Sequence, residues 1–151
     1  MKILLNDALT ILESENPLLN LSTPVGGNLS VLGDVHGQFT DVLHIFDLNG
    51  WPSADNVYVF NGDLVDRGPQ SFEIVLTLLS LKLLTKGLGL KILRGNHETA
   101  RMNSQYGFER ELRRYGFEEG RSLFELTNEV GSKFIYYRGR FQSALLFYIN
   151  S

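Results

Sequence analysis

Three short, mainly apolar runs, each followed by a polar turn that contains glycine, divide this chain of 151 residues. Each run is four residues long, and the segments around it are rich in turn-forming residues, a pattern that is typical of buried β-strands. The predicted strands are residues 29–32, 57–60 and 90–93.

Longer segments lie around these strands and repeat apolar side chains at helical spacing. The predicted helices are residues 2–13, 39–48, 71–84, 104–114 and 120–130. The segment at 71–84 is apolar on nearly every side, so we expect most of its surface to be buried. The last residues, 133–151, are rich in aromatic side chains and are predicted to form a strand pair or an unsettled end.

The alternation of strand, loop and helix predicts an α/β fold with a parallel sheet. In open sheets of this kind, ligands bind at the carboxyl ends of the strands. A polar motif begins where each predicted strand ends, at residues 33–38, 62–68 and 95–98. We therefore expect the three motifs to meet at one edge of the sheet. Their chemically active side chains are Asp34, His36, Asp63, Asp66, Arg67, Asn96 and His97.

These side chains offer oxygen and nitrogen atoms and no sulfur, a ligand set that suits divalent manganese, iron or zinc. Carboxylates gathered without a cation would repel one another, which also favours a metal site. Arg67 carries the planar guanidinium that binds pairs of phosphate oxygens. The glycines beside the acidic residues suit a backbone that turns sharply next to ions or phosphate.

Composition narrows the class of protein. A hydrophobic share of 43% with 21% charged residues is typical of a globular chain, and a net charge of -3 gives no sign of a nucleic-acid-binding surface. Arg110, Arg113 and Arg114 alternate with two glutamates and are expected to form a solvated helix face. The absence of cysteine excludes disulfides and thiolate metal sites. The first residues turn polar too early for a signal peptide and no apolar run approaches membrane-spanning length, so we expect a soluble protein of the cytoplasm or nucleus with no membrane partner.

The three motifs together resemble those of a known family. GDVHGQ at 33–38, GDLVDRG at 62–68 and GNHE at 95–98 are similar to the signature motifs of the metal-dependent serine/threonine protein phosphatases of the PPP family, within the calcineurin-like metallophosphoesterase superfamily. The flanks IFDLNGWPSADNVYVFNGDLVDRG and LRGNHETARMNSQYGFERE resemble its type-five members. The resemblance covers about residues 4–129 and leaves 130–151 as a divergent tail. It implies a single partial catalytic domain over 1–151, looking like the amino-terminal half, with the βαβαβ core of an α/β/β/α sandwich.

The resemblance also implies roles for the metal-binding residues. Asp34 and His36 would bind a first metal ion, Asp63 would bridge two metal ions, and Asn96 would bind the second. The two divalent ions are expected to be manganese, with iron or zinc as alternatives. A hydroxide bound by both metals would attack the phosphorus of phosphoserine or phosphothreonine in phosphoprotein substrates.

In the same family pattern, His97 would be the general acid that protonates the leaving serine or threonine oxygen. Asp66 would pair with the imidazole of His97, and Arg67 would hold phosphate oxygens. An imidazolium paired with a carboxylate is a proton donor that works near neutral pH.

Departures from the family pattern leave alternatives open. Family members carry two further histidine ligands for the second metal and another phosphate-binding arginine in a later part of the chain, and none is recognisable here. The three histidines are His36, His44 and His97, and we expect His44 to be a solvated residue on a polar helix face. The alternatives are a truncated, catalytically impaired fragment that acts as an interaction module, and a nucleotide phosphoesterase of the same superfamily. No regulatory partner can be named from the sequence.

Overall fold

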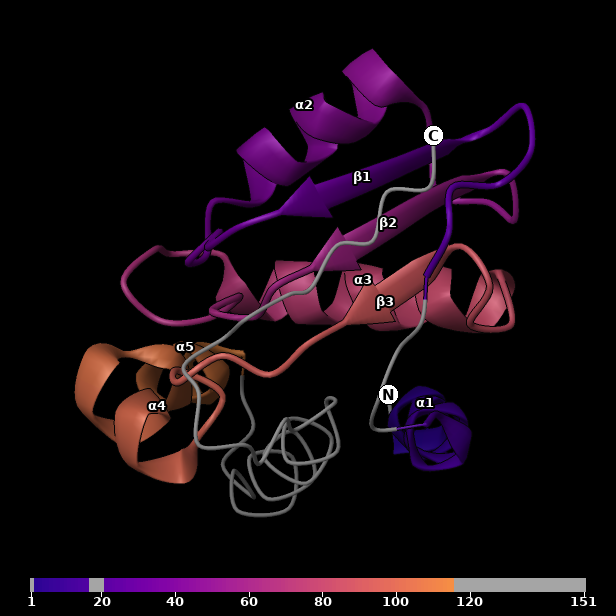
Figure 1. Cartoon of the computed structure of the whole chain (residues 1–151). Helices are drawn as coiled ribbons and strands as arrows, with labels where there is room; N and C mark the ends of the chain where they lie inside the picture. Colours follow the sequence, from indigo (N-terminus) through magenta and orange to yellow (C-terminus); the bar gives the residue numbers. More distant parts are fainter. Residues whose placement is uncertain (1, 17–20, 116–151) are drawn as a thin grey trace, which may run out of the picture.

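The computed structural model describes residues 2–16 and 21–115. Its centre is a three-stranded parallel sheet in the order β1 (Asn28–Leu32), β2 (Asn56–Phe60) and β3 (Leu90–Ile92) (Figure 1). Each strand agrees with its predicted range to within one residue at either end. The predicted α/β fold with a parallel sheet is therefore confirmed.

The three strands end at the same level of the sheet because of their register. Leu32 pairs with Phe60, and Phe60 pairs with Ile92, so the last residues of all three strands lie side by side. A further backbone bond, from the N–H of Leu93 to the carbonyl of Phe60 at 2.8 Å, extends the pairing of β3 by one residue. The loops that follow the strands therefore start together, at the left of Figure 1.

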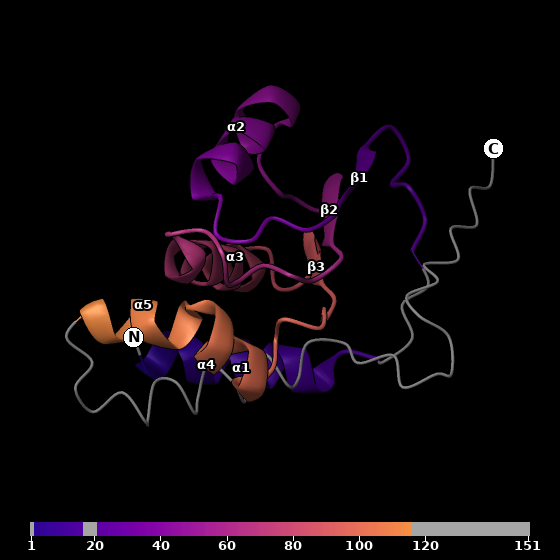
Figure 2. The ribbon, with the colours of Figure 1, turned by 90° about the vertical axis from the view of Figure 1, so that its left-hand side faces the viewer.

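Helices α2 (Phe39–Asn49) and α3 (Ser71–Leu84) connect the strands and lie on the same face of the sheet (Figure 2). Parallel strands need such crossovers, and a helix is the usual connection. Phe46 of α2 packs edge-on against Tyr58 and Phe60 of β2, with ring centroids 5.1 and 6.4 Å apart. As its apolar sequence predicts, α3 is buried along most of its length. This core holds the strand ends in place.

The amino-terminal helix α1 (Lys2–Ser14) packs against α3 through an apolar stripe. The stripe buries Leu5, Ala8 and Leu12, which recur at the helical spacing predicted for residues 2–13. Just beyond the helix, Glu15 forms an ion pair at 2.9 Å with Lys82 of α3, whose side chain is fully buried. The first helix is therefore attached to the core by both apolar and charged contacts.

The single helix predicted for residues 104–114 is wrong, because the structure has two short helices there, α4 (Ala100–Tyr106) and α5 (Phe108–Arg114). Gly107 separates them with a φ of 124°, which an α-helix does not contain and which residues with a Cβ rarely adopt. One glycine inside a helical pattern does not by itself reveal such a break. The helix predicted for 120–130 and the strand pair predicted for 133–151 lie outside the described residues.

The surface of α5 is only partly solvated. Its three arginines are exposed, as predicted, and Arg113 pairs with Glu109 at 2.7 Å. The other interleaved glutamate, Glu111, departs from that prediction because it is buried. It accepts the N–H of Phe72, in the first turn of α3, at 2.8 Å. This buried bond fixes α5 to the start of α3.

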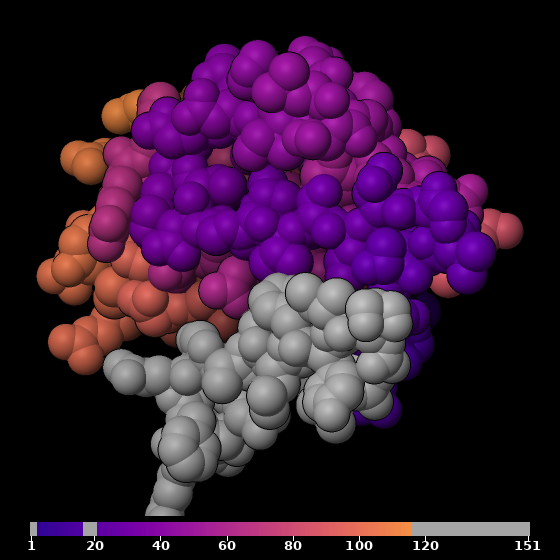
Figure 3. Space-filling view, turned by 45° about the horizontal axis from the view of Figure 1, so that its top comes forward, coloured from indigo at the N-terminus to yellow at the C-terminus, as the bar shows by residue number. Residues whose placement is uncertain are grey.

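Figure 3 brings α2 toward the viewer. Residues of α2 and β1 form one continuous face, and residues of α4 and α5, in orange, lie at its left edge. Within the described part of the chain, every helix is too short or too polar to cross a membrane.

Candidate active site

The loops after β1 and β2 are joined directly by their backbones. The N–H of His36 donates to the carbonyl of Asp63 at 3.0 Å, and the N–H of Gly37 donates to the carbonyl of Leu64 at 2.9 Å. In return, the N–H of Gly68 donates to the carbonyl of His36 at 3.0 Å. The first two motifs therefore form one hydrogen-bonded unit.

Glycine allows the three loops to approach this closely. A Cβ atom on Gly62 would collide with the backbone of Gly95, and a Cβ on Gly95 would collide with Asp63. A Cβ on Gly37 would collide with the backbone of Gly68 in the same way. The three motif loops are therefore in backbone contact, as expected from their positions at the ends of parallel strands.

Left-handed backbone is concentrated in these loops. His36, Asp63, Asp66 and Arg67 have φ values of 38°, 49°, 69° and 67°, and all four were predicted as site residues from the sequence. In the described part of the chain, Lys86 is the only other non-glycine residue with positive φ. Such backbone costs residues with a Cβ about 1 kcal/mol or more, and it clusters at functional sites. The fold thus stores strain where the predicted chemistry lies.

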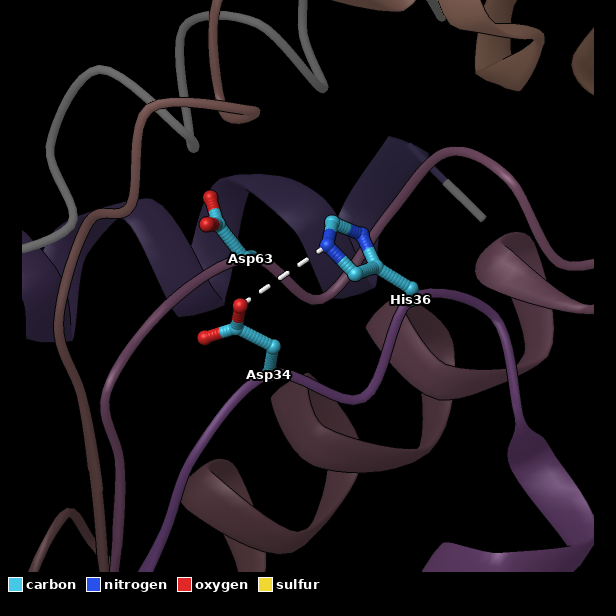
Figure 4. Close-up of side chains that lie close together, drawn as sticks. All are labelled: Asp34, His36 and Asp63. Atoms are coloured by element: carbon cyan, nitrogen blue, oxygen red, sulfur yellow. Dashed lines mark ion pairs between the residues drawn. The ribbon is translucent and has the colours of Figure 1, made fainter.

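Among the described residues, Asp34, His36 and Asp63 form the group of acidic and histidine side chains that could hold a metal ion. One ligand atom from each residue lies within 4.8 Å of the other two. Figure 4 shows them around a common space, with Asp34 and His36 on the loop after β1 and Asp63 on the loop after β2. His44 is exposed on α2, as predicted, and does not belong to this group.

The hydrogen bonding of His36 leaves one ring nitrogen free for a metal. Its Nδ1 lies 2.8 Å from the carbonyl oxygen of Val65, which can only accept, so Nδ1 carries the proton. In the neutral ring, Nε2 then holds a lone pair, and it lies 3.9 Å from Oδ2 of Asp34. Metal-binding histidines commonly fix their second nitrogen in this way. Two carboxylates and one imidazole nitrogen therefore fit the divalent metal predicted from the sequence.

Asp66 and His97 form a buried pair beside this group. Nδ1 of His97 is 2.9 Å from Oδ2 of Asp66, and each residue is only 1% exposed. The other carboxylate oxygen of Asp66 accepts the N–H of Phe108 at 3.0 Å. The ring of His97 stands edge-on to the ring of His36, with centroids 4.7 Å apart. The predicted proton donor is thus a direct neighbour of a predicted metal ligand.

Arg67 and Asn96 are exposed on the second and third motif loops. Nη2 of Arg67 lies 3.4 Å from Nε2 of His97. Asn96 directly precedes His97, whose N–H donates to Oδ1 of Asp63 at 2.8 Å. All seven residues predicted for the site therefore lie on the three connected loops. Their individual roles as metal ligand, acid or phosphate binder stay predictions.

Glu98, the last residue of the third motif, connects the second and third loops. Its carboxylate accepts the backbone N–H groups of Asp63, Leu64 and Gly95 at 2.8 to 2.9 Å. Burial raises the pKa of Glu98, and the three N–H donors oppose that rise. Sequence reasoning missed this role, because the motif shows that a glutamate is present without showing which backbone groups it meets.

Asn103 of α4 is a second residue that sequence reasoning missed. It is 3% exposed, and its Nδ2 donates to the carbonyl of His97 at 2.7 Å and to Oδ2 of Asp66 at 3.3 Å. An asparagine in an amphipathic segment gives no sign of such contacts until the fold brings its partners together.

Known proteins of one family match this chain. The family model of the calcineurin-like phosphoesterases matches residues 28–149. Serine/threonine-protein phosphatase 5 of Arabidopsis thaliana is 53% identical over 96 residues, which make up 64% of this chain and 18% of that protein. The human serine/threonine-protein phosphatase 5 is 52% identical over 103 residues, 68% of this chain and 20% of that protein. Serine/threonine-protein phosphatase T of Schizosaccharomyces pombe is 41% identical over 143 residues, 90% of this chain and 30% of that protein.

A solved structure shares the fold. It is a protein serine/threonine phosphatase from Saccharomyces cerevisiae with similarity to human phosphatase PP5, and it matches with a TM-score of 0.78 and 34% identity over 87% of this chain and 41% of that chain. The expected resemblance to PPP-type phosphatases is confirmed, although this chain spans less than a third of the length of those three curated relatives. The motif loops, the shared fold and the family match together place this chain in the calcineurin-like phosphoesterase family.

Proposed function

We propose that this chain supplies the metal-binding and proton-donating loops of a metal-dependent serine/threonine protein phosphatase whose substrates are phosphorylated proteins. One observation carries the proposal: a cluster of side chains that could hold a metal ion lies directly beside a buried Asp66–His97 pair. The two groups meet at the rings of His36 and His97. The matched family and the names of the relatives support the substrate class.

Asp34, His36 and Asp63 would hold a first divalent metal ion, and Asp63 together with Asn96 would contribute to a second. Asp34 and Asp63 bring two carboxylates to one space, and a cation there would remove their repulsion. Manganese is the metal we propose, and iron or zinc would suit the same ligands. Bound there, the metals would activate a water molecule and neutralise charge on the phosphate.

His97 would donate a proton to the leaving oxygen of serine or threonine. Asp66 bonds Nδ1 and so fixes the ring with Nε2 as the nitrogen left for the substrate. The carboxylate also stabilises the imidazolium, which is the form that donates from Nε2. Because both residues are buried, the pair is held in one geometry.

Arg67 would bind the phosphate oxygens through its exposed guanidinium. The guanidinium lies 3.4 Å from Nε2 of His97, so an anion bound to it would lie within reach of the proton donor. Arginine can only donate, so Nε2 carries no proton while the guanidinium bonds it. A phosphate that draws the guanidinium away would free Nε2 to take up a proton from solvent water, and His97 would later donate that proton to the leaving oxygen.

The test uses the full-length protein that contains this chain, with manganese and a phosphoserine peptide. Asp63→Asn and His97→Ala are each expected to lower kcat/KM by about 100-fold or more, because they remove a shared metal ligand and the general acid. His44→Ala is the matched control, since it removes an exposed histidine on α2, and it is expected to leave the rate unchanged.

Unchanged peptide hydrolysis by both variants would refute the proposal. Faster turnover of diadenosine tetraphosphate than of the phosphopeptide would also overturn it, in favour of a nucleotide phosphoesterase. A full-length wild-type protein that binds manganese and hydrolyses neither substrate would point to an interaction module instead.

A further inference from the structure

The contacts of α4 extend the site beyond the three motifs. We propose that Asn103 is a positioning residue that holds the Asp66–His97 pair in the orientation required for proton donation. This inference rests on the proposed phosphatase function. It adds a residue of α4 to a site that is otherwise formed by the three motif loops.

Asn103 bonds both members of the pair. Its Nδ2 amide donates to the carbonyl of His97 at 2.7 Å and to Oδ2 of Asp66 at 3.3 Å. The first bond fixes the backbone of the histidine, and the second fixes the carboxylate that orients the histidine ring. At 3% exposure, Asn103 has little water near it to replace either bond. One side chain therefore links the two partners in addition to their own bond.

The ends of α4 hold Asn103 at this point. Thr99 caps the helix, and its N–H donates to the carbonyl of His97 at 2.8 Å, so the residue that caps α4 is bonded to the histidine. After the turn at Gly107, the N–H of Phe108 donates to Oδ1 of Asp66 at 3.0 Å. Both oxygens of Asp66 are thereby bonded, and the carboxylate cannot rotate without losing a partner.

The position of Asn103 requires a group that donates twice. The carbonyl of His97 only accepts, and an ionised Asp66 only accepts. An asparagine amide meets both, whereas leucine has a similar size and no donor. Aspartate also lacks the donor and would add a second negative charge next to Asp66.

Loss of the two Asn103 bonds is expected to slow the hydrolysis of some substrates more than that of others. A serine oxygen is a poor leaving group and needs a proton as the bond to phosphorus breaks. Nitrophenolate leaves readily without that proton. A displaced Asp66–His97 pair should therefore slow peptide hydrolysis while sparing nitrophenyl phosphate. A general loss of folded protein would slow both reactions to the same extent.

The kinetic test compares a phosphoserine peptide with p-nitrophenyl phosphate, using the full-length protein with manganese. Asn103→Leu is expected to lower kcat for the peptide roughly 10- to 100-fold, and kcat for the nitrophenyl ester by less than about threefold. KM for the peptide is expected to change little, because Arg67 remains. Gln105→Leu is the matched control, since it removes an exposed amide from the same helix and leaves both bonds of Asn103 in place, and it is expected to preserve the ratio of the two rates.

A second measurement needs no activity. In the 151-residue chain, the Nδ1 proton of His97 that bonds Asp66 should give a separate downfield imidazole NMR signal, and the chain has only three histidines to assign. Asn103→Leu is expected to speed its exchange with water by about tenfold. The Nδ1 proton of His36, which bonds the carbonyl of Val65, is the internal reference and should not change.

Equal loss of kcat on both substrates, or an unchanged His97 signal in the folded variant, would overturn the inference. Either result can occur while the wild type remains an active phosphatase, so the inference can fail without the proposed function. Should Asn103→Leu fail to fold, Asn103→Ser keeps one donor in a smaller side chain. This variant is also expected to lose more kcat on the peptide than on the nitrophenyl ester, by a smaller factor than Asn103→Leu. Equal losses on the two substrates would count against the inference.

Discussion

At the scale of single residues, the close packing of the motif loops requires glycine, which has no Cβ atom, at particular positions. A Cβ at Gly95 would collide with the side chain and the backbone of Asp63. Gly33 opens the first motif as Gly95 opens the third. In the described part of the chain, no atom outside its two neighbouring residues lies within 4 Å of its Cβ position. Glycine is therefore required at one of these positions and dispensable at the other.

Gly95→Ala is expected to destabilise the chain by about 1–3 kcal/mol, the range for forcing an extra group into packed structure. Gly33→Ala is expected to change the free energy of unfolding by less than about 0.5 kcal/mol, because its side chain would face open space. Urea denaturation followed by circular dichroism measures both values. Equal stability of the two variants would contradict the close contact between Gly95 and Asp63.

The residues of the candidate metal-binding group could be predicted from the sequence, and the residues that support the loops around it could not. Asp34, His36 and Asp63 are recognisable because the ligand atoms are part of the residue type. Glu98 and Asn103 act mainly on backbone groups, and a sequence does not show which backbone groups will lie beside them.

At the scale of elements, a buried charge attaches the start of the chain to α3 and β3. Nζ of Lys82 lies 2.9 Å from Glu15 and donates to the carbonyl of Leu90 at 3.1 Å, with 0% of the residue exposed. Lys91 of β3 bonds the same carboxylate at 3.0 Å. Burial lowers the pKa of Lys82, and the bond to Glu15 opposes that change. One carboxylate therefore compensates cations from two elements.

Glu15→Gln is expected to destabilise the chain by about 3 kcal/mol or more, because it leaves the buried ammonium of Lys82 without a countercharge. Lys82→Met is expected to be nearly neutral at pH 7, since an apolar side chain then fills the same space. Lys91→Met, which removes the more exposed partner, is the control and should cost less than about 1 kcal/mol. Urea denaturation ranks the three variants. A loss in Lys82→Met as large as that in Glu15→Gln would contradict this account.

The difference in the free energy of unfolding between wild type and Lys82→Met is expected to depend on pH. Between the lowered pKa of folded Lys82 and the ordinary lysine value of 10.5, the unfolded chain holds a proton that the folded chain has released. The unfolded state therefore binds more protons, and the free energy of unfolding rises as pH rises through this interval. Wild type is expected to gain stability relative to Lys82→Met on the alkaline side of neutrality. A constant difference would show that burial leaves this pKa at its ordinary value.

Helices and strands could be predicted from the spacing of apolar residues where apolar contacts stabilise the structure. The three strands and the buried α3 follow from their apolar residues. The buried position of Lys82 does not, because lysine usually extends its ammonium to solvent and its partner here, Glu15, lies 67 residues earlier. The break at Gly107 also depends on a bond from α5 to Asp66, which only the folded chain brings within reach.

At the scale of the whole molecule, the sheet brings distant segments together. The strands end in register, so their loops open at one edge, and two of those loops supply the candidate metal-binding group. This convergence could be predicted, because parallel strands share one direction. The left-handed backbone at His36 and Asp66 could not, since it depends on how closely neighbouring loops pack.

Metal binding is therefore expected to stabilise the whole molecule, because Asp34, His36 and Asp63 form a group only in the folded chain. Manganese at about 100 times its Kd should add about 2.7 kcal/mol to the free energy of unfolding and raise the Tm of the 151-residue chain. Differential scanning calorimetry measures this rise. Asp34→Asn should remove most of it by taking away a charged ligand, while His44→Ala, the change at an exposed histidine on α2, should keep it. A rise that persists in Asp34→Asn and disappears in His44→Ala would place the metal on α2 and away from the strand ends.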